Sequence, residues 1–86
     1  MQFLKYEFRA HAGDVIEINL DHAANVLLLD SNNFSNYRSG RRYRYSGGFA
    51  RRSPVRLQVP HEGHWYVVVD LGGLAGRVRA NARLVC

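Results

Sequence analysis

The side chains best suited to bind another molecule lie between Asp30 and Glu62. No acid occurs between these two residues, whereas seven arginines do. The arginines are Arg38, Arg41, Arg42, Arg44, Arg51, Arg52 and Arg56, and aromatic residues Tyr37, Tyr43, Tyr45 and Phe49 are interleaved with them. Arginine pairs with phosphates and carboxylates through a planar fork, and aromatic rings stack on nucleic-acid bases. The basic segment 38–56 is therefore a candidate site for nucleic acid or another polyanion.

A second interpretation of the same segment is purely structural. If residues 42–45 form a strand, alternation sends Tyr43 and Tyr45 into the core and leaves Arg42 and Arg44 in water. Charged residues on an edge strand also protect it from pairing with other chains. The sequence leaves both interpretations of the arginines open.

The segment from Asp30 to Gly40 is unusually rich in Asn and Ser. Such side chains cap backbone amides in turns, so the segment predicts a structured loop in which Phe34 and Tyr37 anchor the chain. That loop is either structural or shaped for a ligand, and in the second case Asn33 and Tyr37 are candidate contacts.

Patterns that indicate catalysis or metal binding are absent. The four histidines are scattered over predicted turns, and His61 and His64 at a turn-to-strand junction need not converge. The serines lack a nucleophile motif, and the glycine pairs lack the spacing of a phosphate-binding loop. We therefore expect no catalytic residue, no metal site and no cofactor, and we expect that the protein is not an enzyme.

Length and composition indicate a single domain over residues 1–86. The chain has 12 Lys and Arg against 7 Asp and Glu, a net charge of +5, and 47% hydrophobic residues, which is typical of a folded basic protein. Its apolar runs are too short to span a bilayer, and its N-terminus does not resemble a signal peptide. From the short apolar runs we expect no membrane segment. One cysteine cannot form an internal disulfide, so we also expect a cytoplasmic location.

Alternation of apolar and polar residues predicts most of the strands, and two continuous apolar runs predict the others: residues 25–29, consistent with a central strand, and residues 65–69. The predicted strands cover residues 3–9, 15–20, 25–29, 42–45, 55–59, 65–69 and 77–84, with Gly47-Gly48 and Gly72-Gly73 as breaks between them. No stretch has the apolar period of a long helix. Seven or eight short strands with one inward face each predict an all-β fold, a jelly-roll-like sandwich of two antiparallel sheets.

Several strings of residues resemble a known family. They are Phe3-Leu4-x-Tyr6, Gly13-Asp14-Val15, Ala24-Asn25-Val26, Leu29-Asp30-Ser31-x-Asn33-Phe34-x-x-Tyr37, Gly40, Tyr45-x-Gly47-Gly48, Ser53-Pro54-Val55 and the run from Gly63 to Leu71. Across nearly the whole chain they resemble a small bacterial family, number 1883 among the domains of unknown function. The resemblance implies a compact β-sandwich that occurs alone or joined to other domains, notably TIR-type signalling domains. It implies no reaction, cofactor or catalytic residue.

Three functions compete on these observations. The first is a non-catalytic interaction or sensing module that recognises a protein or a small anionic ligand. The second is binding of nucleic acid through the basic segment, and the third is a structural homodimer joined through an edge strand. The candidate contact residues are Asn33, Tyr37, Arg38, Arg41, Arg42, Arg44, Arg51 and Arg52.

Overall fold

The computed structural model describes residues 3–72 and 76–85; Gly73 of the predicted second turn and Cys86 lie outside the described residues. The elements are β1 (Leu4–Ala10), β2 (Val15–Leu20), β3 (Ala24–Asp30), α1 (Ser31–Arg38), β4 (Ser46–Ala50), β5 (Val55–Gln58), β6 (Gly63–Asp70) and β7 (Ala80–Val85). None of the helical structure in these residues is long and apolar enough to cross a membrane.

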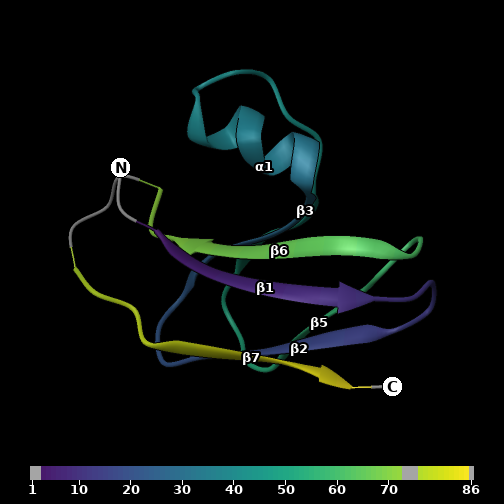
Figure 1. Cartoon of the computed structure of the whole chain (residues 1–86). Coiled ribbons are helices and arrows are strands. Elements are labelled where there is room, and N and C mark those ends of the chain that lie inside the picture. The colour runs from purple at the N-terminus through teal and green to yellow at the C-terminus, as the bar shows by residue number, and fades with distance from the viewer. Residues whose placement is uncertain (1–2, 73–75, 86) are drawn as a thin grey trace.

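The strands form two antiparallel sheets that pack face to face (Figure 1). One sheet has the order β1-β6-β3-β4 and the other has the order β5-β2-β7. The chain passes from one sheet to the other at every connection except that from β3 to β4. The predicted all-β sandwich is confirmed, with seven strands and no long helix in the described residues.

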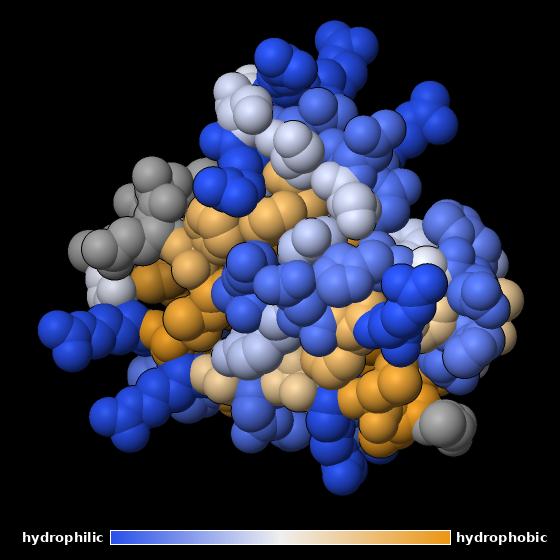
Figure 2. Space-filling model, in the orientation of Figure 1, coloured by the Kyte–Doolittle hydropathy of each residue, from blue (hydrophilic) through white to orange (hydrophobic). Residues whose placement is uncertain are grey.

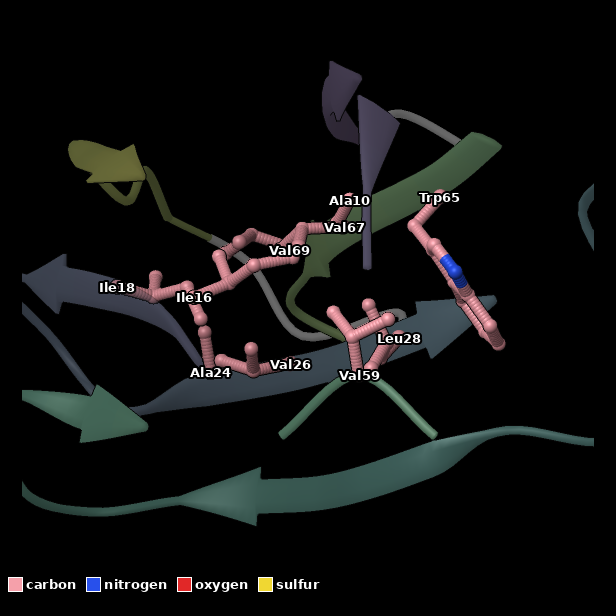
Figure 3. Close-up of a cluster of buried hydrophobic side chains, with 10 residues drawn as sticks. All are labelled: Ala10, Ile16, Ile18, Ala24, Val26, Leu28, Val59, Trp65, Val67 and Val69. Atoms are coloured by element: carbon pink, nitrogen blue, oxygen red, sulfur yellow. The ribbon is translucent and has the colours of Figure 1, made fainter. Parts of the chain in front are cut away.

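The main core fills the space between the two sheets, where Figure 3 shows side chains converging from both. It forms because alternate residues of each strand are apolar, as Ile16 and Ile18 are in β2. Trp65 of β6 is buried in this core. Its indole Nε1 donates to the His61 carbonyl oxygen at 2.9 Å. The core residues are Ala10, Ile16, Ile18, Ala24, Val26, Leu28, Val59, Trp65, Val67 and Val69.

A second apolar cluster lies on the outer face of the four-stranded sheet, beneath α1. In Figure 1, α1 lies on the side of β6 and β1 that faces away from β2 and β7. Phe34 and Tyr37 of the helix pack against Leu27, Leu29 and Val68 of the sheet. Strands β3 and β6 are therefore buried on both faces, which explains why their sequences are continuously apolar instead of alternating.

The loop predicted from Asp30 to Gly40 is wrong, because residues 31–38 form a helix. Asp30 is its N-cap: the Asp30 carboxylate accepts the backbone N–H of Asn33 at 2.8 Å. The helix is only 8 residues long and polar on one side. Packing of Phe34 and Tyr37, three residues apart and both buried, is what offsets its weak intrinsic propensity.

The strand predicted over residues 42–45 is also wrong. Strand β4 begins at Ser46 and contains Gly47 and Gly48, which were expected to end a strand. Tyr43 is half-buried against Tyr37, but Tyr45 is 52% exposed and lies outside the core. The structural interpretation of this segment therefore fails for Tyr45.

Candidate functional site

The basic segment does not form one continuous groove, because the fold divides its arginines among three places. Arg38 ends α1, and Arg41, Arg42 and Arg44 follow in the loop to β4. Arg51 and Arg52 lie in the loop between β4 and β5, and Arg56 is in β5. Figure 2 shows the hydrophilic residues that gather over the α1 end of the molecule.

Arg56 is held in an ion pair on the outer face of the three-stranded sheet. Its Nη2 lies 3.0 Å from Oε2 of Glu17, and Nη2 of Arg83 lies 2.9 Å from Oε1 of the same carboxylate. Glu17 is directly opposite both arginines in the strand register and is only 7% exposed. The hydrogen bonds from Arg83 and Arg56 lower the pKa of Glu17. Arg56 therefore belongs to an ion pair that stabilises the sheet and has a partner within the protein.

The remaining arginines of the segment are exposed and unpaired. Within residues 3–72 and 76–85, no carboxylate oxygen lies within 4.0 Å of their guanidinium nitrogens. These free arginines are Arg38, Arg41, Arg42, Arg44, Arg51 and Arg52. They are the same six arginines that the sequence nominates as candidate contacts, and they remain accessible to an anionic partner.

The two other candidates, Asn33 and Tyr37, are occupied by contacts inside the protein. The Asn33 side-chain amide donates to Asp30 at 2.9 Å, and its oxygen accepts the backbone N–H of Arg44 at 2.6 Å. Asn33 therefore ties the loop after α1 back to the start of the helix. Tyr37 is buried, and its hydroxyl donates to the Asp70 carboxylate at 2.6 Å.

Burial, reinforced by the hydrogen bond to Asp70, raises the pKa of Tyr37. Asp70 is itself 5% exposed and accepts two more hydrogen bonds, from the Asn25 side chain and the Gly72 backbone, each at 2.9 Å. This network fastens α1 to the end of β6.

The helix leaves a groove of about 410 Å³ along one side, between α1 and the strands β1 and β6. We call it the α1 groove, and its lining residues are Lys5, Glu7, Ser31, Phe34, Ser35, Arg38, Ser39 and Tyr66. Ser31, Ser35 and Ser39 are spaced by four residues, so their hydroxyls share one side of the helical segment.

Two cations are held beside aromatic rings in the α1 groove. The Phe34 ring stacks on that of Tyr66, with centroids 4.2 Å apart and an interplanar angle of 5°. Lys5 Nζ lies 5.7 Å from the Phe34 centroid, and the Arg38 guanidinium carbon lies 5.8 Å from it. Both distances are within the range of cation–π attraction. Each of the two cations thus lies beside the Phe34 ring.

One acid, Glu7, belongs to the same groove. Its carboxylate lies 2.9 Å from Nε2 of His64 and 3.1 Å from Nζ of Lys5. Hydrogen bonding to His64, and then to Lys5, lowers the pKa of Glu7, so the group is ionised at neutral pH. The groove therefore combines two cations, one anion and three hydroxyl groups.

Sequence reasoning missed Lys5, Glu7, Tyr66 and the serines as parts of a site. The four-residue serine spacing was the available signal, but it has meaning only on a helix, and a loop was predicted there. His61 and His64 have different partners, since the His61 ring lies 4.8 Å from that of Trp65 at a tilted angle and His64 contacts Glu7. Among the described residues, no three His, Cys, Asp or Glu side chains are grouped as metal ligands.

Comparison with known proteins identifies the family of the chain. No curated protein and no solved structure matches it. The family model for a domain of unknown function (DUF1883) does match, and the match covers residues 1–86. The predicted family resemblance is confirmed at this level: the chain belongs to the DUF1883 family of domains of unknown function.

Proposed function

We propose that the protein is a non-catalytic binding module that takes a small anionic ligand in the α1 groove. The observation that carries the proposal is the pair of cations, Lys5 and Arg38, held within 6 Å of the same Phe34 ring beside the serine hydroxyls. A cation that is already positioned loses less conformational freedom when a ligand arrives. Lys5 is also paired with Glu7 at 3.1 Å, whereas Arg38 has no carboxylate partner among the described residues, so Arg38 is the cation that is free to receive a negatively charged group.

The groove chemistry supports a ligand that carries both a phosphate or carboxylate and free hydroxyl groups. Lys5, Arg38 and the three serines supply hydrogen-bond donors for the anionic group. Glu7, ionised and facing the same space, supplies an acceptor for a ligand hydroxyl. The volume of about 410 Å³ lies in the range of small-molecule sites, roughly 300–1,000 Å³. Sugar phosphates and nucleoside monophosphates have this combination of groups.

Binding without catalysis is supported by how the ionisable groups are used. Glu7 is paired on both sides, and its lowered pKa makes it a poor proton acceptor at neutral pH. Among the described residues, no histidine or carboxylate hydrogen-bonds to the hydroxyl of Ser31, Ser35 or Ser39. The groove therefore has no activated nucleophile of the serine–base type.

The test is an NMR titration of the isotope-labelled protein with ribose 5-phosphate, adenosine monophosphate and inorganic phosphate. We expect saturable shifts in the amides of α1 and β1. Lys5→Gln and Arg38→Gln should each weaken binding roughly tenfold or more, because each removes a charge-assisted contact. Arg77→Gln is the matched control, since Arg77 is exposed and does not line the groove. The proposal would be overturned if none of the probes caused amide shifts, or if the shifts and the affinity were unchanged in both groove variants.

A further inference from the structure

The most exposed large apolar side chains in the described residues are two aromatic rings, one on strand β4 and one just before it. Phe49 is 55% exposed and Tyr45 is 52% exposed, whereas Leu84 and Leu4 follow at 37% and 36%. Phe49 belongs to β4, and Tyr45 immediately precedes it. Rings of this size are normally buried, so an exposed pair at one place indicates a contact surface.

Both rings project from the same face of the four-stranded sheet. Ala50 packs against the core between the sheets, so its neighbour Phe49 points to the opposite, outer face. Tyr45 reaches that outer face as well: its ring lies 5.6 Å from that of Tyr43, which in turn packs on Tyr37 beneath α1.

The position of β4 in the sheet leaves the rings accessible from the side. β4 is an edge strand, paired only with β3 in its sheet. Gly47 and Gly48 lie between the two rings and contribute no side chain. Tyr45 precedes β4, so the four-residue step between the two rings spans at most about 13 Å of extended chain. Each ring can therefore take a separate flat partner.

The surroundings of these rings are positively charged. Arg44 precedes Tyr45, and Arg51 follows β4 with its guanidinium carbon 5.9 Å from the Phe49 centroid. Neither arginine has a carboxylate within 4.0 Å among the described residues. Of the acids on this face, Asp70 is buried and bound to Tyr37 and Asn25, and Glu7 lies in the α1 groove, paired with Lys5 and His64. The sequence between Asp30 and Glu62 contains no acid, and the exposed Asp21 lies at the Arg51 end, where it lines a small pocket together with Arg51 and Arg52.

We propose that Arg44, Tyr45, Phe49 and Arg51, here called the β4 strip, bind single-stranded nucleic acid. Two bases stack on the rings of Tyr45 and Phe49, and the arginines pair with the flanking phosphates. A single strand is the partner that fits because its bases have free faces, which a duplex conceals. An acidic peptide or a lipid headgroup would satisfy the arginines and leave the rings without a specific role. This surface is separate from the α1 groove, which none of the four residues lines.

The test is a fluorescence-anisotropy titration with a short labelled oligothymidylate, repeated over a series of salt concentrations. Binding should weaken with salt at a slope of about −0.7 per phosphate contacted. Tyr45→Ala and Phe49→Ala should each reduce affinity roughly tenfold or more without changing this slope, because they remove stacking and not charge. Arg44→Gln and Arg51→Gln should each lower affinity and make the slope shallower.

Matched variants separate stacking from general effects. Phe49→Tyr keeps the ring and should retain binding, while Leu84→Ala removes an exposed apolar side chain from β7 and should have no effect. Lys5→Gln should change binding in the α1 groove and leave the oligonucleotide affinity intact. Thermal melting of every variant checks that the fold is preserved.

The proposal is overturned by any of three results. The first is no binding of oligothymidylate at low salt, and the second is binding that persists unchanged in the Tyr45→Ala, Phe49→Ala double variant. The third is equal affinity for polyaspartate or for vesicles containing anionic lipid, since that result would identify a general polyanion surface.

Discussion

At the scale of single residues, the ion pair around Glu17 shows how this basic chain stabilises a buried acid. Each neighbouring strand contributes one arginine, and each arginine directs both Nε and Nη2 to one carboxylate oxygen of Glu17. Such charge-assisted hydrogen bonds are stronger than neutral ones. Replacing the acid leaves two guanidinium groups facing each other across β2, so the arrangement depends on Glu17 remaining ionised.

This ion pair predicts an acid-dependent loss of stability. The pKa of Glu17 is lowered by folding, so its stabilising contribution is complete above the usual glutamate pKa of about 4.3. It is lost as the pH falls through the lowered value. Glu17→Gln should therefore be less stable than the natural chain at pH 7, and the two proteins should converge in acid. Denaturant unfolding of both proteins across pH 2 to 7 measures the difference.

Glu7 and Asp21 also have lowered pKa values. Their protonation in acid destabilises both proteins to the same extent. The difference between the two unfolding curves therefore isolates Glu17. If the two curves stay parallel throughout, the carboxylate charge contributes nothing to the fold.

Residue types alone could identify the arginines as accessible cations but could not reveal their partners. Arg56 and the six free arginines belong to the same acid-free segment, yet only Arg56 lies opposite Glu17, which is 39 positions away in the sequence. Asn33 and Tyr37 were candidate ligand contacts, and their hydrogen bonds to Arg44 and Asp70 are equally invisible before strand register is known. Long-range pairing, and not residue chemistry, decides these assignments.

At the scale of elements, periodicity predicted the strands whose faces alternate and failed where packing overrides propensity. The alternating strands β1, β2 and β5 lie close to their predicted positions, as do β3 and β6, which were predicted from continuous apolar runs, and β7 begins three residues later than predicted. The helix α1 was missed because Asn and Ser are weak helix formers, and its Asp30 cap and its buried face are effective only with β3 and β6 beneath them. β4 was missed because two glycines normally weaken a strand.

The glycines of β4 have a positional requirement that predicts a stability difference. Gly47 has φ of +109°, and a methyl group there would overlap the carbonyl oxygen of Val26. Gly48 has φ of +148°, but a methyl group there would meet open space. Both Ala variants have strained backbones, at about 1–2 kcal/mol each. Gly47→Ala should lose clearly more stability than Gly48→Ala, because only the first must also displace β3 or β4.

Denaturant unfolding of the two variants checks this comparison, with Gly48→Ala as the matched control. Equal losses would show that β4 can move away from Val26 without cost. Because Tyr45 and Phe49 flank these glycines, the Gly47→Ala variant should also bind oligothymidylate less tightly than Gly48→Ala does.

At the scale of the whole molecule, the four-stranded sheet is the layer that both apolar clusters share. One cluster joins it to the three-stranded sheet, and the other joins it to α1. The sequence predicted the sandwich, since each strand had one apolar face. It did not predict the third layer, because residues 31–38 were predicted as a loop and the outer cluster forms only when they fold into α1 over β3 and β6. The homodimer joined through an edge strand, the third function expected from the sequence, stays a prediction because the structure contains one chain.

This layering predicts that α1 can open while the sandwich stays folded. Phe34→Ala removes the ring that stacks on Tyr66 and anchors the helix, and this ring belongs to the outer cluster and not to the core between the sheets. Trp65→Ala removes a side chain of that core, and we expect it to cost about 3–5 kcal/mol in the free energy of unfolding. Amide hydrogen exchange measured by mass spectrometry distinguishes local from global opening.

In Phe34→Ala, exchange should accelerate in residues 31–45 and remain near the natural rate in β2 and β7. In Trp65→Ala it should accelerate in both sheets together, because every strand then opens by global unfolding. Where Trp65→Ala proves too unstable to purify, Trp65→Phe gives the same comparison with a smaller loss. If Phe34→Ala accelerates exchange in β2 as much as in α1, the molecule opens as one cooperative unit. Ligand binding in the α1 groove could then not be coupled to a local movement of the helix, and the groove would have to be treated as rigid.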